Sequence, residues 1–249
     1  MKFIGIIPAR YASTRFPGKP LADIFGKPMI RWVYENSSGM IDFVVVATDD
    51  NRIYDTVNKF GGKVVMTSPH HTSGTDRCNE AMDIVVREFR QSFDVVINIQ
   101  GDEPFINPSQ IKSVMDCFKD PDTQIATIIK PVTCPDDLFN PNIPKVIINL
   151  KNEAVYFSRS AIPYIRNTVQ EEWVKKHVFY RHIGLYAYRN DILKKITGLA
   201  PSTLEKAESL EQLRWLENGF RIRTAFTEDE SIPVDTPEDI DKILRTRIP

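Results

Sequence analysis

The first half of the chain alternates short apolar runs with longer stretches in which apolar residues recur every three or four positions. Such short, β-branched runs are typical of buried strands, and the longer stretches are typical of amphipathic helices. We expect strands at residues 3–7, 43–48, 63–66, 95–99 and 125–130, and helices over residues 29–37, 52–60, 75–90 and 108–118. This alternation predicts an α/β fold, a mostly parallel sheet with helices on both faces.

The pattern changes after Pro131. Strands are expected at 145–149, 154–158 and 180–189, with a hairpin turn at 151–153. No crossover helix fits between the first two strands, so about residues 133–181 are predicted to form an antiparallel lobe embedded in the domain. The rest should hold helices over 190–197 and 204–218, the latter ended by Gly219, a strand at 221–226 and a final helix with Thr236 as its N-cap. We predict a single domain over residues 1–249.

A cationic loop follows the first expected strand. It begins at Pro8 and carries Arg10, Arg15 and Lys19 among small and hydroxylated residues. Arginine binds phosphate oxygens with a planar fork and lysine supplies a compact charge, so a loop of this kind at the carboxyl end of a parallel strand can hold a polyphosphate. The alternative is an ordinary basic surface loop. The prolines and the turn-forming glycine of the segment favour a fixed loop path and hence a binding site: Pro8, Pro17, Gly18 and Pro20.

Two carboxylates stand in comparable positions. Asp102 comes just after the apolar run at 95–99, within Gln-Gly-Asp-Glu-Pro, and Asp235 precedes the expected last helix. Magnesium favours one or two carboxylates together with substrate phosphates, so both are candidate ligands. Asp102 could also belong to an ordinary turn, and Asp235 could simply start a helix. Their combination with the cationic loop favours the metal site.

Composition narrows the class of protein. The chain has 249 residues and a formal net charge of −1, so nothing points to a nucleic-acid or membrane surface. Neither the G-x-G-x-x-G nor the P-loop pattern is present. The three cysteines, Cys78, Cys117 and Cys134, are scattered and are expected to be reduced thiols in a cytoplasmic protein. No signal peptide or spanning segment is expected. The four histidines lack an H-x-x-x-H pair, which argues against zinc.

Several motifs together resemble those of the 3-deoxy-manno-octulosonate (Kdo) cytidylyltransferase family, the CMP-Kdo synthetases. The resemblance runs in order from residue 4 to about residue 240. It comprises the cationic loop, the Gln-Gly-Asp-Glu-Pro turn and the Val-Asp-Thr-Pro-Glu-Asp segment, together with residues 157–159, 181–186 and 210–214. The ordered set is specific, although each motif alone is weak.

The resemblance implies a Rossmann-like nucleotidyltransferase fold in a homodimer. It implies transfer of CMP from CTP to Kdo with Mg²⁺ as cofactor, giving CMP-Kdo and pyrophosphate for lipopolysaccharide biosynthesis. Asp102 and Asp235 would hold the metal and act in catalysis with Arg10 and Lys19. The nucleotide-binding set would be Ala9, Arg10, Arg15, Lys19, Ser73, Gly74, Arg77 and Gln100. The sugar-acid set would be Arg159, His182, Tyr186, Glu211 and Gln212.

Alternatives remain at several of these positions. Tyr186 could be a core residue, Glu211 an exposed helical residue, and Arg159 a support for the lobe. His70 and His71 are expected to be surface-loop residues. The substrate could be another sugar acid, such as sialic acid or an amino-substituted Kdo, or the chain could be a non-catalytic nucleotide-binding relative. Apolar and aromatic residues of the lobe are predicted to carry the dimer contact: Val155, Tyr156, Phe157, Ile162, Tyr164 and Ile165.

Overall fold

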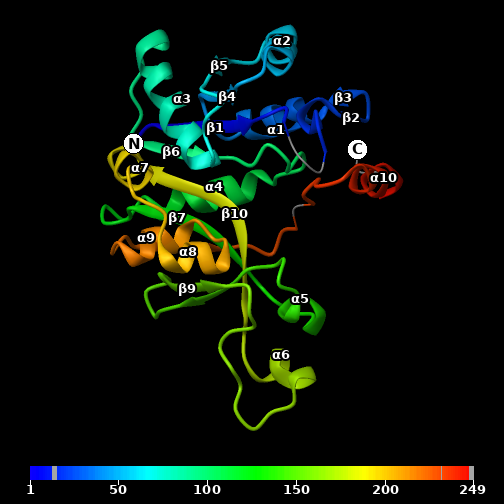
Figure 1. Ribbon diagram of the computed structural model, residues 1–249, viewed down its shortest axis with the longest axis vertical. Helices are drawn as coiled ribbons and strands as arrows, with labels where there is room; N and C mark the ends of the chain where they lie inside the picture. Colours follow the sequence, from blue (N-terminus) through cyan, green and yellow to red (C-terminus); the bar gives the residue numbers. More distant parts are fainter. Residues whose placement is uncertain (13–15, 231, 247–249) are drawn as a thin grey trace. The chain divides into compact units, whose positions relative to one another are not determined.

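The computed structural model describes residues 1–12, 16–230 and 232–246 (Figure 1). These residues form two compact units. The first unit comprises Met1–Lys112 and Asp229–Pro249, and the second comprises Ser113–Glu228. Within the described residues, no helix is both long and apolar enough to cross a membrane.

The first unit is built on a parallel sheet. Strand β1 (Phe3–Ala9) lies between β4 (Val44–Thr48) and β6 (Val95–Asn98), and β5 (Val64–Met66) pairs with β4 on the outer side. All residues of β4 and β6 are buried. Strands buried on both faces need apolar side chains in continuous runs, which explains why the sequence pattern located them.

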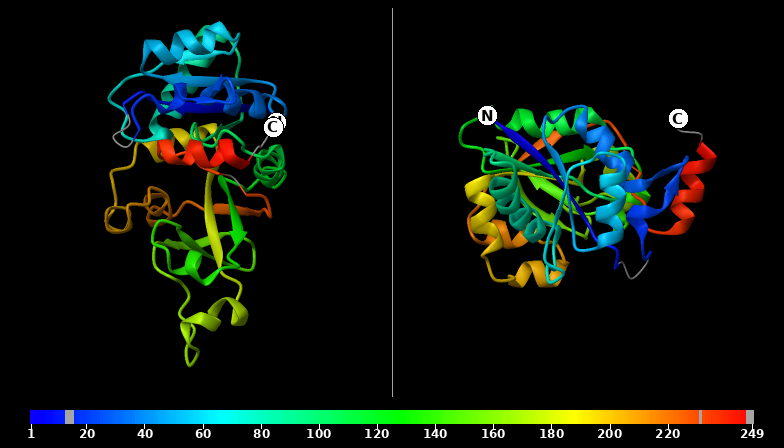
Figure 2. Two further views of the ribbon diagram at one scale, coloured as in Figure 1. Left: turned by 90° about the vertical axis from the view of Figure 1, so that its right-hand side faces the viewer. Right: turned by 90° about the horizontal axis from the view of Figure 1, so that it is seen from above.

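Helices cover this sheet. Helices α1 (Met29–Ser38) and α2 (Asn51–Lys59) lie on one side of it, and α3 (Gly74–Phe89) lies on the other (Figure 2). This follows from right-handed crossovers, because the chain reverses its direction across the sheet between β5 and β6. Helices α2 and α3 begin at capping residues. The Asp50 side chain accepts a hydrogen bond from Arg52 N at the start of α2, and Ser73 accepts one from Asp76 N at the start of α3. Helix α4 (Pro108–Cys117) follows β6.

The carboxyl-terminal segment packs back onto the first unit. Helix α10 (Pro237–Thr246) contributes Ile240 and Ile243 to a cluster with Val234. Ile24, from the hairpin of β2 (Asp23–Ile24) and β3 (Lys27–Pro28), and Met29, the first residue of α1, complete this cluster. Four of these five cluster residues are fully buried. Burial of this apolar surface fixes the position of the polar residues that lie next to it in the chain.

The second unit contains a mixed sheet. Strand β7 (Ile125–Pro131) pairs in parallel with β11 (Ile222–Phe226) and antiparallel with β10 (Tyr180–Arg189). Strand β8 (Lys145–Ile148) pairs antiparallel with β10 and with β9 (Ala154–Ser158). The antiparallel pairing expected for the strands at 145–149 and 154–158 is confirmed by β8 and β9. The turn at 151–153 is also confirmed, with Asn152 at φ 57°.

The second unit also contains short helices, which are α5 (Pro135–Phe139), η2 (Gln170–Glu172), α6 (Trp173–Lys176), α7 (Asn190–Thr197), α8 (Thr203–Glu208) and α9 (Gln212–Glu217). Trp173 and Phe179 pack with Val132 and Leu138 in a separate apolar cluster within the predicted lobe. Helices as short as α5 and α6 show no apolar periodicity, so the sequence pattern did not predict them.

The prediction of one helix over 204–218 is wrong. The chain forms α8 and α9 instead, separated at Ser209, whose φ is 51°. The guanidinium of Arg159 explains the break, because its Nε donates to the Glu208 carbonyl (2.6 Å) and its Nη2 donates to the Ser209 carbonyl (3.2 Å). Gly219, at φ 81°, follows α9 as expected.

Gly101 allows the turn after β6 to approach the end of β1. A Cβ at this position would lie 2.8 Å from the Pro8 carbonyl oxygen, which is backbone and cannot turn away. We therefore expect Gly101→Ala to lower the free energy of unfolding by about 1–3 kcal/mol, measured by urea denaturation. Gly39→Ala is the control, because an added Cβ would lie 3.8 Å from its nearest neighbour, the Asn36 carbonyl oxygen, and the φ of Gly39 is −69°. Equal stability of the two variants would contradict the argument.

Candidate functional site

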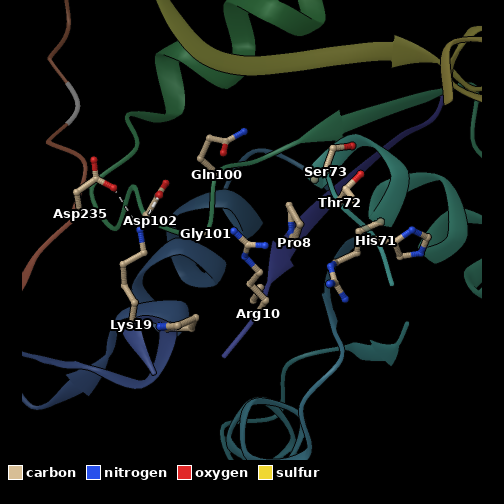
Figure 3. A pocket seen from close by; sticks show the side chains of 14 residues that line it. Pro8, Arg10, Lys19, His71, Thr72, Ser73, Gln100, Gly101, Asp102 and Asp235 are labelled. Carbon is tan, nitrogen blue, oxygen red and sulfur yellow. Dashed lines mark hydrogen bonds and ion pairs between the residues drawn. The ribbon is translucent and has the colours of Figure 1, made fainter. Parts of the chain in front are cut away.

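A cavity of about 260 Å³ opens in the first unit, beyond the carboxyl ends of β1 and β6 (Figure 3). Open parallel sheets bind ligands at this edge. Its walls come from the end of β1, the loop before α3, the turn after β6, the 3₁₀ helix η1 (Lys19–Leu21) and the segment before α10. The lining residues are Pro8, Ala9, Arg10, Lys19, Pro20, His71, Thr72, Ser73, Gly74, Arg77, Gln100, Gly101, Asp102 and Asp235.

Every described member of the predicted nucleotide and metal sets lines this cavity. Arg15 lies outside the described residues. In Figure 3, Lys19, Asp102 and Asp235 lie at one end, His71 and Ser73 lie at the other, and Arg10 is between them. The cavity therefore has a charged end and an end formed by the start of α3.

Lys19 joins the two predicted metal ligands. Its Nζ donates to Asp102 Oδ2 at 2.8 Å and to the Val234 carbonyl at 2.8 Å, and it lies 3.7 Å from Asp235 Oδ1. Gly18 places it there, because a φ of 75° at this position starts η1 in a conformation that favours glycine. Asp102 and Asp235 are brought together from distant parts of the chain by the Val234 N–H, which donates to the Asp102 carbonyl at 2.8 Å.

The carboxylate pair fits a magnesium ion. Mg²⁺ is bound in proteins by one or two carboxylates plus substrate phosphates, and both carboxylates here are partly exposed to the cavity. Within residues 1–12, 16–230 and 232–246, no cluster of three or more histidine, cysteine, aspartate or glutamate side chains could hold a metal by itself. The donor set therefore suits a metal whose remaining ligands come from a bound nucleotide.

The α3 end of the cavity offers donors for an anion or a polar base. Ser73 caps the helix, and Gly74 lies so close to β1 that an added Cβ would be 3.3 Å from Pro8 Cγ. The amino terminus of a 16-residue helix carries partial positive charge. Arg77 is buried, with Nη1 donating to the Thr67 hydroxyl at 2.6 Å and Nη2 to Asp49 at 2.7 Å. These two bonds fix the guanidinium at the wall.

His71 and Thr72 also line the cavity, and the sequence pattern did not identify either. His71 was expected to be a surface-loop residue, but its Nε2 lies 2.5 Å from Glu80 Oε2, which also accepts from Ser68 N at 2.8 Å. Burial favours a higher pKa for the Glu80 carboxyl, but the hydrogen bonds from Ser68 and His71 outweigh it and lower the pKa. His70 is exposed, as expected. The sequence signal that could have identified His71 as a cavity residue is its position two residues before Ser73.

The predicted sugar-acid residues belong to the second unit. His182 Nε2 lies 2.9 Å from the Thr127 hydroxyl, and its ring contacts those of Phe157 and Tyr186 at centroid distances of 5.1 Å. Desolvation lowers the pKa of His182 to about 3, so the imidazole is neutral at pH 7. Desolvation, together with the nearby Glu211 carboxylate, raises the pKa of Tyr186 well above its ordinary value. Both side chains are therefore neutral hydrogen-bonding groups.

Buried donors of α9 without a hydrogen-bond acceptor in the described part of the chain include Gln212 Nε2 and Trp215 Nε1. The rings of Tyr186 and Trp215 meet edge to face at 5.1 Å, and Gln212 and Trp215 lie three residues apart on α9. Buried donors without partners are costly, which favours a ligand or water that accepts from them. Trp215 was not predicted from the sequence, although its helical spacing from Gln212 was a usable signal.

Arg159 and Glu211 already have protein partners. The three donor groups of Arg159 bind the carbonyl oxygens of Pro141 (3.0 Å), Glu208 (2.6 Å) and Ser209 (3.2 Å). Glu211 accepts from Arg214 Nη2 at 3.1 Å. The support role that the sequence left open for Arg159 is thus consistent with its contacts, and its place in a sugar-acid pocket stays a prediction.

Comparison with known proteins shows which family the chain belongs to. Residues 4–229 match the family model described as cytidylyltransferase. A 3-deoxy-manno-octulosonate cytidylyltransferase of Parabacteroides distasonis is 61% identical over 98% of this chain and 97% of the relative, and one of Cytophaga hutchinsonii is 53% identical over 99% and 98%.

A solved structure of a CMP:2-keto-3-deoxy-manno-octonic acid synthetase complexed with CTP agrees with a TM-score of 0.89 at 42% identity, covering 99% of this chain and 98% of that one. The predicted fold class is thereby confirmed. The chain therefore belongs to the cytidylyltransferase family, among the 3-deoxy-manno-octulosonate cytidylyltransferases.

Proposed function

We propose that this protein transfers CMP from CTP to the anomeric hydroxyl of Kdo, giving CMP-Kdo and pyrophosphate for lipopolysaccharide biosynthesis. The observation that carries the proposal is the cavity in which Arg10 and Lys19 lie with the carboxylate pair of Asp102 and Asp235. Cations and a carboxylate pair at one sheet edge suit a metal-bound triphosphate. The family membership supports the same activity.

Charge explains how the side chains act. The hydroxyl attacks the α-phosphorus in line with the departing pyrophosphate, so negative charge accumulates on the leaving group. Arg10 and Lys19 hold and stabilise the β- and γ-phosphates, and no covalent protein nucleophile is required. Asp102 and Asp235 hold Mg²⁺, which neutralises phosphate charge when it is bound. Ala9, Ser73, Gly74, Arg77 and Gln100 hold the remainder of the nucleotide, together with Arg15.

On the sugar side, the proposed contacts are mostly neutral. Gln212 supplies a donor that lacks a protein acceptor among the described residues, Tyr186 supplies a neutral hydroxyl, and His182 supplies a neutral imidazole. A sugar acid is rich in acceptor oxygens and suits such donors. Glu211 and Arg159 complete the predicted set. We further propose that residues 1–249 act as one nucleotidyltransferase domain in a cytoplasmic homodimer.

The decisive experiment measures pyrophosphate release with CTP, Mg²⁺ and a panel of sugar acids. We expect release with Kdo and little with sialic acid. Release with sialic acid or an amino-substituted Kdo alone would support CMP transfer but identify a different sugar-acid substrate. No release with any sugar acid would indicate a non-catalytic nucleotide-binding relative.

Asp102→Asn serves as the matched control for this assay. The amide keeps the side chain's shape but removes its charge, and Mg²⁺ prefers anionic oxygen, so turnover should be lost with the fold intact by circular dichroism. Full Mg²⁺-dependent turnover in this variant would show that Asp102 is not a metal ligand.

Arg159→Lys tests the sugar-side assignment. Lysine keeps the charge but loses the planar fork. If Arg159 binds the substrate carboxylate, the KM for the sugar acid should rise at least about tenfold, roughly 1.4 kcal/mol, with the KM for CTP little changed. The thermal midpoint is measured in parallel. A lower midpoint without a selective rise in the sugar-acid KM would instead assign Arg159 to the support of the α8–α9 junction.

The predicted lobe should carry the dimer contact. Phe157 is buried within the second unit, but Val155 and Tyr164 are 54% and 75% exposed. A cavity of about 690 Å³, lined by residues that include Ile148, Leu150, Ile162 and Val178, lies in the same part of the chain. A C₂ pair is the commonest way to cover such a surface.

We expect a dimeric mass by sedimentation at micromolar concentration, and a monomeric mass for Val155→Asp. Val86→Asp, which changes a 42% exposed valine of α3, is the control and should remain dimeric. A monomeric wild-type protein would refute a stable dimer.

A further inference from the structure

The contacts of Lys19 have a consequence for metal binding, and the argument rests on the proposed function. The Lys19 ammonium donates to Asp102 at 2.8 Å and lies 3.7 Å from Asp235, the two carboxylates that would hold Mg²⁺. Its side chain is only 14% exposed. The ammonium group therefore lies among the oxygens that the metal requires.

The local charge of this site differs between two arrangements, one with the Lys19 ammonium next to the carboxylates and one with it turned away. Two carboxylates and one ammonium leave a local charge of −1, which attracts a dication weakly and places a like charge next to it. When the ammonium leaves, the local charge becomes −2 and matches Mg²⁺. A compact lysine charge on a flexible stem can move in this way, and triphosphate oxygens offer it an alternative partner.

The main chain of both aspartates is also held by bonds that do not involve Lys19. The Asp102 carbonyl accepts from Val234 N at 2.8 Å, and Asp235 N donates to Asp239 Oδ2 at 3.1 Å. Thr236 N also donates to Asp239, at 3.0 Å. These bonds hold the two main-chain segments next to each other, so both aspartates remain at the cavity when Lys19 turns away.

We infer that Lys19 acts as a built-in competitor of the metal, so that the free protein binds a divalent cation poorly until nucleotide phosphates draw the ammonium away from Asp102 and Asp235. Lys19 then stabilises the phosphates while the metal occupies the carboxylates. Nucleotide and metal thereby bind cooperatively, and by linkage each raises the affinity for the other by the same factor.

The test measures Mn²⁺ binding to the full chain by electron paramagnetic resonance, without nucleotide. Lys19→Met removes the charge and keeps an apolar stem, and it should bind Mn²⁺ at least about tenfold more tightly than wild type, within the usual range of coupling between sites. Lys19→Arg keeps the charge and should bind as weakly as wild type. Adding Asp102→Asn to Lys19→Met should abolish the gain.

Lys27→Met is the matched control for net charge. Lys27 belongs to the same unit and pairs with Glu35 at 2.8 Å, outside the cavity lining. Equal Mn²⁺ affinity of Lys19→Met and Lys27→Met would overturn the inference, and so would a gain that survives Asp102→Asn, because the ion would then lie elsewhere. Circular dichroism establishes that each variant is folded.

A non-hydrolysable CTP analogue supplies the second measurement. It should tighten Mn²⁺ binding more in wild type than in Lys19→Met, because in the variant the competing charge is already gone. An equal effect in both proteins would contradict the role of Lys19. These readouts need no sugar acid and no turnover. Cooperative binding without pyrophosphate release would thus support this inference while refuting the cytidylyltransferase proposal.

Discussion

A single main-chain hydrogen bond, from Val234 N–H to the Asp102 carbonyl, sets the geometry on which the candidate site depends. It joins the turn after β6 to the segment before α10, and so brings Asp102 and Asp235 to one point. Two like charges repel, so their proximity requires a stable frame. The frame consists of the buried cluster beneath Val234 and of Gly101, whose lack of a Cβ lets the turn approach Pro8. Apolar packing thus determines where the charges lie.

The sequence predicted those parts of the fold that depend on local pattern. Strands β4 and β6 are fully buried runs, and α2 and α3 begin at the capping residues Asp50 and Ser73, so the hydrophobic pattern and the capping residues were sufficient to find them. The break between α8 and α9 could not be predicted in this way. It depends on Arg159, which is distant in the chain and binds the Glu208 and Ser209 carbonyls. A tertiary contact here overrides the helical pattern.

The residues of the candidate site differ in the same way in how far local sequence predicts them. The cationic loop and both carboxylates were recognisable, because their residue types are suited to phosphate and metal. The loop and Asp102 also follow apolar strands, and Asp235 precedes a helix. His71 and Trp215 were missed, since nothing in their local sequence shows that one pairs with Glu80 or that the other carries a buried donor beside Tyr186. Arg159 shows the converse limit. Its residue type suits a substrate carboxylate, but its neighbours in space are three main-chain carbonyls.

The two units present different kinds of polar group, and the difference follows from what each would bind. Phosphate chemistry changes the charge on the reacting atoms, so full charges such as those of Lys19 and Asp102 act on it strongly. Sugar hydroxyls stay neutral and are distinguished by the direction of hydrogen bonds. A buried donor such as Gln212 Nε2, which has no acceptor among the described residues, penalises any ligand that fails to offer one. Because the pKa of His182 is lowered to about 3 and that of Tyr186 is raised, both groups keep one protonation state throughout the neutral range. Substrate selection by these groups would therefore be constant across the pH range in which the phosphate chemistry operates.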